Sequence, residues 1–89
     1  MILEMKKFGN ILNSRPAASE AVLRVKQIIN GSEDKEITLD FCNVEVLTPS
    51  FADEFAKGLK KLYPNEQIRY QGYENNKIVK DVLEKLSIL

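Results

Sequence analysis

Segments with helical periodicity alternate with short segments of β character along this chain. Apolar residues recur every three or four positions in three stretches, which predicts three amphipathic helices. Short runs of alternating or β-branched apolar residues precede each of these stretches and predict strands. Because a helical crossover joins parallel strands, this order predicts an α/β fold with a largely parallel sheet. The 89 residues are expected to form one domain, residues 1–89.

The predicted strands are short and are separated by turn residues. Leu3 and Met5 alternate with charged residues, as expected for a strand with one buried face. Residues 44–47 either continue the third strand through a bulge or form a connection under the sheet. Residues 32–36 are polar and predict a surface loop. The expected sheet is four-stranded and mixed, mainly parallel, with strands at residues 3–6, 11–12, 37–41 and 67–71.

Each predicted helix has one apolar face. Pro16 suits the first turn of the first helix, with Ser14 or Arg15 as the cap, and Asn30-Gly31 suits its end. The third helix is expected from residue 75 or 76 to residue 86. The residues expected to be buried against the sheet are Ala18, Ala21, Val22, Val25, Ile28 and Ile29; Phe51, Ala52, Phe55, Ala56, Leu59, Leu62 and Tyr63; and Ile78, Val79, Val82, Leu83 and Leu86.

The start of the second helix has two possible registers. In one, Thr48 is the cap and Pro49 is the first helical residue. In the other, Ser50 is the cap and Asp53, three residues later, completes a variant of the capping box. Both registers concentrate polar groups at a helix N-terminus.

The composition argues against several classes of function. Thirteen basic and thirteen acidic residues cancel, so the chain lacks the overall field of a nucleic-acid or membrane-surface binder. The absence of histidine removes Ser-His and Cys-His pairs and the usual zinc sites. The single cysteine, Cys42, is expected to be a packed small residue in a reducing compartment. We therefore expect a cytoplasmic protein with no metal, no cofactor and no membrane-spanning segment.

Residues 37–54 read ITLDFCNVEVLTPSFADE. This segment resembles the STAS-like family of unknown function, whose core has a strand, Asp-Phe, a short apolar link and Ser-Phe-Ala-Asp-Glu at the start of a helix. Phe8-Gly9 and Ser14-Arg15 resemble the same family before its first helix. The resemblance covers nearly the whole chain and implies a STAS-like fold.

The STAS-like family is similar in turn to true STAS domains, including anti-sigma-factor antagonists. In those proteins a partner kinase phosphorylates a serine at the start of the second helix. By this resemblance, Asp40 matches the strand aspartate and Thr48 stands where the turn aspartate would be. Pro49 and Ser50 take the two serine positions, and Phe51 replaces the glycine. The resemblance therefore implies a protein partner with an ATPase-kinase fold and makes Ser50 the candidate phosphosite.

Polar residues at the end of the third strand and at the start of the second helix predict a binding site, because α/β folds bind ligands at such ends. We expect a non-enzymatic module that regulates or binds a protein partner. A phosphoswitch on Ser50 is the first alternative, and a plain capping role for Ser50 is favoured over it. The predicted partner-binding residues are Asp40, Thr48, Ser50, Asp53 and Glu54.

Two further functions stay open. A small enzyme would use Asp40 and Glu54 and would need a closed pocket with a perturbed carboxylate pair. A nucleic-acid binder would use lysines near the second helix, although a zero net charge disfavours nucleic acid as a partner. The candidate basic residues are Lys57, Lys60, Lys61 and Arg69.

Tyr73 is expected to be the most exposed of the three tyrosines, with Tyr63 and Tyr70 at the core edges.

Overall fold

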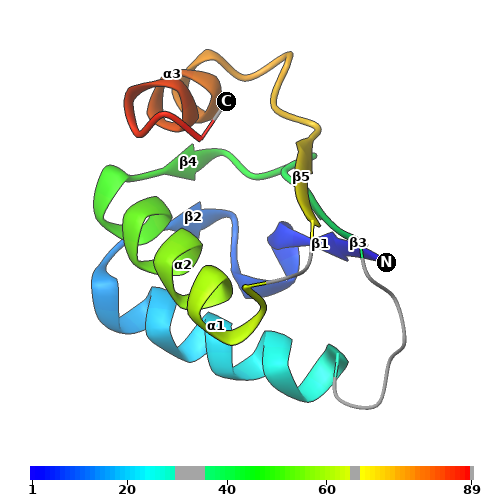
Figure 1. Ribbon diagram of the computed structural model, residues 1–89. Coiled ribbons are helices and arrows are strands. Elements are labelled where there is room, and N and C mark those ends of the chain that lie inside the picture. The colour runs from blue at the N-terminus through cyan, green and yellow to red at the C-terminus, as the bar shows by residue number, and fades with distance from the viewer. Residues whose placement is uncertain (30–35, 65–66, 89) are drawn as a thin grey trace.

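The computed structural model describes residues 1–29, 36–64 and 67–88 (Figure 1). All three predicted helices are present in the expected order, and strands precede each of them. The elements are β1 (Ile2–Glu4), the 3-10 helix η1 (Met5–Phe8), β2 (Ile11–Leu12), α1 (Arg15–Ile29), β3 (Glu36–Asp40), β4 (Val46–Leu47), α2 (Pro49–Leu62), β5 (Gln67–Gln71) and α3 (Lys77–Lys85).

The described strands form two parallel sheets. β1, β3 and β5 pair in the order β1-β3-β5, and β2 pairs with β4. The predicted single four-stranded mixed sheet is therefore not confirmed. The first strand ends at Glu4, because η1 turns the chain, and Met5 is buried in η1 instead of in a strand. Residues 44–47, for which a bulge or a connection was expected, contain β4.

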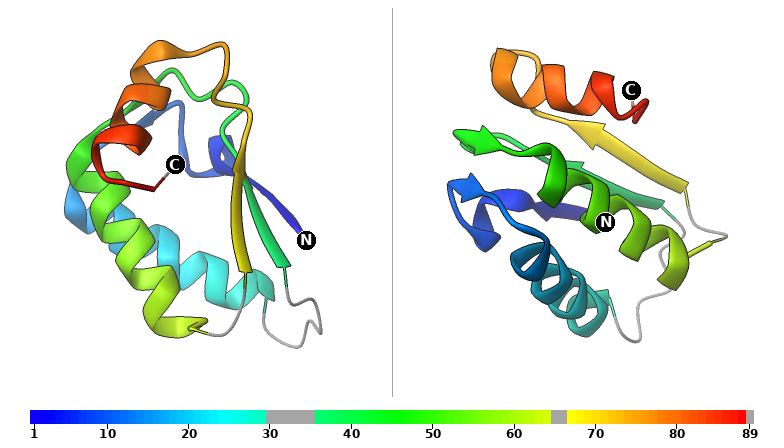
Figure 2. Two further views of the ribbon diagram at one scale, coloured as in Figure 1. Left: turned by 45° about the horizontal axis from the view of Figure 1, so that its top comes forward. Right: turned by 90° about the vertical axis from the view of Figure 1, so that its left-hand side faces the viewer.

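The helices lie on one side of the three-stranded sheet (Figure 2). α1 and α2 pack against each other, whereas α3 mainly contacts β4 and α2. The core anchors of the three helices, Val25, Phe55 and Val82, are all buried, as predicted. Leu3, Ile37 and Leu39 are the buried strand residues that alternation places on the helix side. The opposite face of this sheet carries mostly polar residues, together with the exposed Ile2 of β1.

Three residues of the predicted apolar stripes are exposed instead of buried. Ile28, Leu62 and Ile78 are 42%, 36% and 55% exposed, respectively. Apolar periodicity finds the side of a helix that faces the core, but the width of the covered stripe depends on the neighbouring elements. Glu36, expected in a surface loop, is the first residue of β3. The rest of that loop, residues 32–35, and the predicted helix end at Asn30-Gly31 lie outside the described residues.

Side-chain caps define the starts of α1 and α3. The Ser14 hydroxyl accepts a hydrogen bond from the Ala17 N–H at 3.3 Å, which settles the open choice of cap in favour of Ser14. Asn76 Oδ1 accepts from the Val79 N–H at 3.1 Å. Asn76 Nδ2 also donates to the carbonyl oxygen of Val44 at 2.9 Å. Asn76 therefore joins the start of α3 to the segment between β3 and β4.

Candidate functional site

Thr48 caps α2. Its Oγ1 accepts from the Phe51 N–H at 3.4 Å and donates to the Leu12 carbonyl oxygen at 3.5 Å. Pro49 follows as the first helical residue, where its missing N–H removes no intrahelical hydrogen bond. The register with Thr48 as the cap is therefore confirmed. The capping role favoured for Ser50 is wrong, because Ser50 is already inside the helix.

Ser50 is the second residue of α2, and it is exposed. Its hydroxyl forms no hydrogen bond with another described residue. The N–H groups of a first helical turn and the helix dipole favour an anion at this position. Ser50 is thus a polar side chain for which the local fold provides no structural role.

Asp53 and Glu54 form ion pairs that join α2 to the start of α1. Arg15 Nη1 lies 3.0 Å from Asp53 Oδ2 and 3.4 Å from Glu54 Oε1. Lys57 Nζ lies 3.2 Å from the same Asp53 oxygen, one helical turn along α2. The Arg15 hydrogen bond, followed by the Lys57 hydrogen bond, holds the pKa of Asp53 below its ordinary value of 3.8. The start of α2 is thus a surface of paired charges.

We expect acid to remove the contribution of Asp53 to stability. A carboxylate with a lowered pKa in the folded state stabilises the fold above its unfolded pKa, and this stabilisation disappears as pH falls through the folded pKa. The unfolding free energy of wild type should therefore exceed that of Asp53→Asn at pH 6, and the gap should close below the ordinary Asp53 pKa of 3.8. Urea unfolding of both proteins at several pH values checks this. A gap independent of pH would contradict it.

Asp40 lies at another part of the molecule. Its Oδ1 accepts from the Cys42 N–H at 2.9 Å and lies close to Gly72, after β5. Residues 41–45 and β4 run between the end of β3 and the start of α2 (Figure 1). The structure therefore brings Thr48, Asp53 and Glu54 together around Ser50, and leaves Asp40 apart from them.

An open hollow of about 410 Å³ lies near Asp40, at the carboxyl ends of β3 and β5. Cys42 lines it and is exposed, so the prediction of a packed cysteine is wrong. Cys42 and Asn43 form a turn in which Asn43 has φ of 68°, and both residues are exposed. Tyr73, expected to be exposed, packs partly buried against the core, as Tyr63 and Tyr70 do.

A family model for the STAS-like domain of unknown function (DUF4325) matches residues 19–77 of the chain. The chain belongs to this family. The match includes β3, β4, α2 and β5, and so covers both the Asp40 region and the start of α2. A search of curated proteins and a search of solved structures each found no match.

The basic residues of this STAS-like domain do not form one patch. Arg69 Nε pairs with Glu36 Oε1 at 2.6 Å across β3 and β5. Since Ile68 and Tyr70 face the helices, alternation places Arg69 on the opposite face of the sheet from α2. Lys57 is engaged with Asp53. The structure therefore does not bring the α2 lysines together with Arg69, and the patch that a nucleic-acid binder would use is not formed by these residues.

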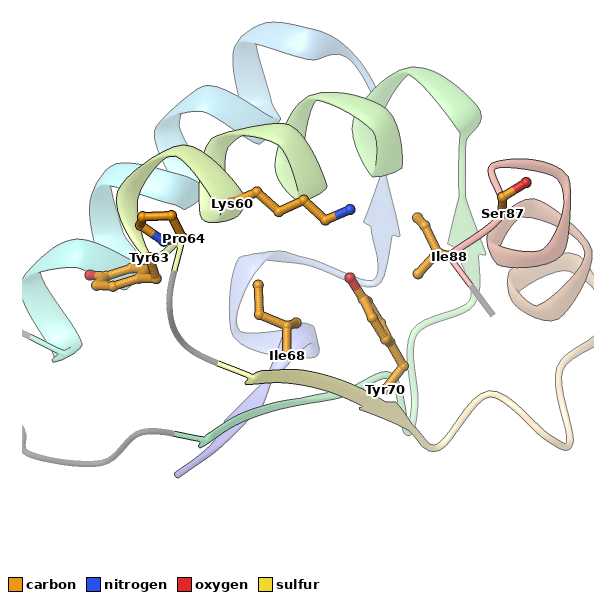
Figure 3. Close-up of a pocket in the computed structure, with 7 residues that line it drawn as sticks. All are labelled: Lys60, Tyr63, Pro64, Ile68, Tyr70, Ser87 and Ile88. Carbon is orange, nitrogen blue, oxygen red and sulfur yellow. The ribbon is translucent and has the colours of Figure 1, made fainter.

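The STAS-like domain has a groove that the sequence reasoning missed (Figure 3). The groove has a volume of about 430 Å³ and lies between α2, β5 and the residues that follow α3. Burial raises the pKa of Tyr70, on the floor of the groove, above its ordinary value. Only the alternation of Ile68 and Tyr70 with polar residues hinted at a one-sided strand here. The lining residues are Lys60, Tyr63, Pro64, Ile68, Tyr70, Ser87 and Ile88.

The core of the domain is filled. The hollow between the sheet and α2, near Phe51 and Phe55, holds only about 10 Å³. In residues 1–29, 36–64 and 67–88, no three Cys, Asp or Glu side chains are grouped as a metal site would need. None of the helices in this part of the chain combines the length and apolarity required to cross a bilayer. No hydrogen bond or ion pair joins Asp40 to Glu54 among the described residues.

Proposed function

We propose that this STAS-like domain is a non-enzymatic regulatory module that binds a protein partner through the start of α2. The interface comprises Thr48, Ser50, Asp53 and Glu54, together with Arg15. The observation that carries the proposal is the exposure of Ser50 beside a cap that Thr48 already provides. A filled core also favours binding at the surface over binding inside the domain.

A phosphoswitch on Ser50 is the second candidate, and two observations favour it. Ser50 is accessible at a helix N-terminus, where a phosphate gains hydrogen bonds from N–H groups and from the dipole. Asp53 and Glu54 lie within one turn, but both are already paired with Arg15, which weakens their repulsion of a phosphate. The partner that this candidate implies is a regulator with an ATPase-kinase fold.

The variants at Ser50 and Thr48 separate binding from capping. Thr48→Ala should lose about 1 kcal/mol of stability, as is usual for a lost cap. Ser50→Ala should change stability by less than about 0.5 kcal/mol, because the side chain is exposed and its hydroxyl bonds to no described residue. Ser50→Asp should also keep the fold, since an acid suits the first helical turn. Thermal melting of the three variants measures these differences.

Partner binding is tested with the same variants. Tagged wild type, Ser50→Ala and Ser50→Asp are used to capture proteins from the native host, and each captured protein is quantified by mass spectrometry. A partner that wild type and Ser50→Ala retain, and that Ser50→Asp loses, supports the interface at the start of α2. Equal recovery of every protein by all three would contradict it. Phosphate on Ser50 in protein isolated from the native cell would support the switch.

Two other functions have different signatures. If the domain were a nucleic-acid binder, captured nucleic acid would dissociate steeply with salt. If it were an enzyme using Asp40 and Glu54, replacing either carboxylate would abolish its catalytic activity. The proposed module has neither property, and its partner binding should persist after Asp40→Asn.

A further inference from the structure

β5 has an unpaired edge. Among the strands that the structure describes, β5 pairs with β3 on one side and with no strand on the other. The Phe41 N–H donates to the Gln71 carbonyl oxygen at 2.9 Å, so the backbone of Gln71 faces β3. Because alternate residues of a parallel strand bond to opposite neighbours, the N–H and C=O groups of Ile68 and Tyr70 point away from β3. Such an edge is a template for another extended chain.

The side chains of the same two residues form the floor of the groove. Figure 3 shows Ile68 and Tyr70 rising from β5 towards α2, with Lys60 above them and Ile88 at one side. A second hollow, of about 170 Å³, shares Lys60, Ser87 and Ile88 with the groove and extends it along α2. A strand added to β5 would therefore direct every second side chain into a trough lined by both apolar and polar side chains.

Lys60 determines the charge that the trough accepts. Its side chain lines both hollows, and no ion pair joins it to another described residue. Lys57, which lines only the smaller hollow, is already bound to Asp53. Asp53 also lines the smaller hollow, but Arg15 and Lys57 already bind it. An acidic side chain that entered the trough would thus meet, in Lys60, a cation that no described carboxylate pairs with.

We propose that this edge and trough bind an extended segment of a partner protein. The segment pairs with the Ile68 and Tyr70 backbone and carries, at alternate positions, apolar side chains and one acidic side chain that faces Lys60. The trough reaches Asp53 through the smaller hollow, but Ser50 lines neither hollow. This inference therefore goes beyond the function proposed above, and variants of Ser50 test the two separately.

A second copy of the chain is a poorer occupant. Antiparallel pairing of two β5 strands through Ile68 and Tyr70 would centre on Arg69 and place each Arg69, paired with its own Glu36, opposite the other copy. It would also bring together two troughs that each contain Lys60. Like charges directly opposite each other destabilise a strand pair. The charge pattern therefore favours an acidic segment from another protein.

The test uses the full chain and a phage-displayed library of random short peptides. We expect the enriched peptides to share apolar residues at alternate positions with an acid in the same register. Hydrogen exchange followed by NMR should show that a synthetic enriched peptide protects the amides of Ile68 and Tyr70. The Arg69 amide, which faces β3, should change little. Lys60→Glu should weaken peptide binding by about tenfold or more, whereas the neighbouring exposed Lys61→Glu should not.

Several results would overturn the proposal. These are a library without enrichment, a consensus of basic residues, and peptide binding that leaves the Ile68 and Tyr70 amides unprotected. Equal weakening by Lys60→Glu and Lys61→Glu would also reject the trough. Protection of both amides in a concentration-dependent dimer without peptide would assign the edge to a second copy. Ser50→Asp should leave peptide binding unchanged, so failure here is distinguishable from failure of the interface at α2.

Discussion

Phe55→Ala should remove roughly 3–5 kcal/mol from the free energy of unfolding, the usual loss for a buried phenylalanine. Phe55 is 3% exposed, and its ring stacks on Phe51 at a centroid distance of 5.7 Å and tilts against Phe8 at 6.2 Å. The truncation would leave a cavity where α2, η1 and the sheet meet. Since small domains are stable by only about 5–15 kcal/mol, this one change should remove much of the stability.

Chemical denaturation of wild type and Phe55→Ala measures this loss. The free energy of unfolding should fall with denaturant concentration at the same slope in both proteins. Leu23→Ala is the matched control, because Leu23 is a large apolar residue of α1 that is 59% exposed. It should change stability by less than about 0.5 kcal/mol. A Phe55→Ala protein that melts within a few degrees of wild type would contradict the burial of this face of α2.

Gly72→Ala should be the second strongly destabilising change. Gly72 has φ of 78°, which disfavours residues with a side chain. An added Cβ would lie 2.7 Å from the backbone nitrogen of Cys42, which cannot rotate away as a side chain does. The backbone strain and the overpacking together predict a loss of about 2–4 kcal/mol.

The Gly72 variants also separate these two causes. Asparagine tolerates positive φ better than alanine but has the same Cβ. If the close contact dominates, Gly72→Asn should lose nearly as much stability as Gly72→Ala. If asparagine restored wild-type stability, the contact with residues 40–42 would not be the cause. Hydrogen exchange of the Cys42 amide, which donates to Asp40, should rise in both variants if the end of β3 is displaced.

The structure and the family match confirm some of the functional predictions and correct others. The resemblance of residues 37–54 to the STAS-like family is confirmed by the family match over residues 19–77. Ser50 lies at the start of α2, as predicted, but Thr48 and not Ser50 is the capping residue. Asp40 was grouped with Ser50 because both follow a strand, and the structure separates them by residues 41–45 and β4. Spacing along the chain does not reveal how far an irregular segment carries two polar groups apart.

The sequence by itself determined the three helices, most of their buried faces and the family. Helical hydrogen bonds join residues four apart, so apolar spacing, Pro16 and Pro49 indicate where α1 and α2 lie, although the structure decided which residue caps each of them. Only the tertiary structure decided the division of the sheet, the pairing of Arg15 with Asp53 and the groove beside β5. Arg15 and Asp53 are 38 positions apart, and β2 and β4 are joined through a similar separation. Local periodicity does not predict such contacts, because they depend on how the packed elements align in space.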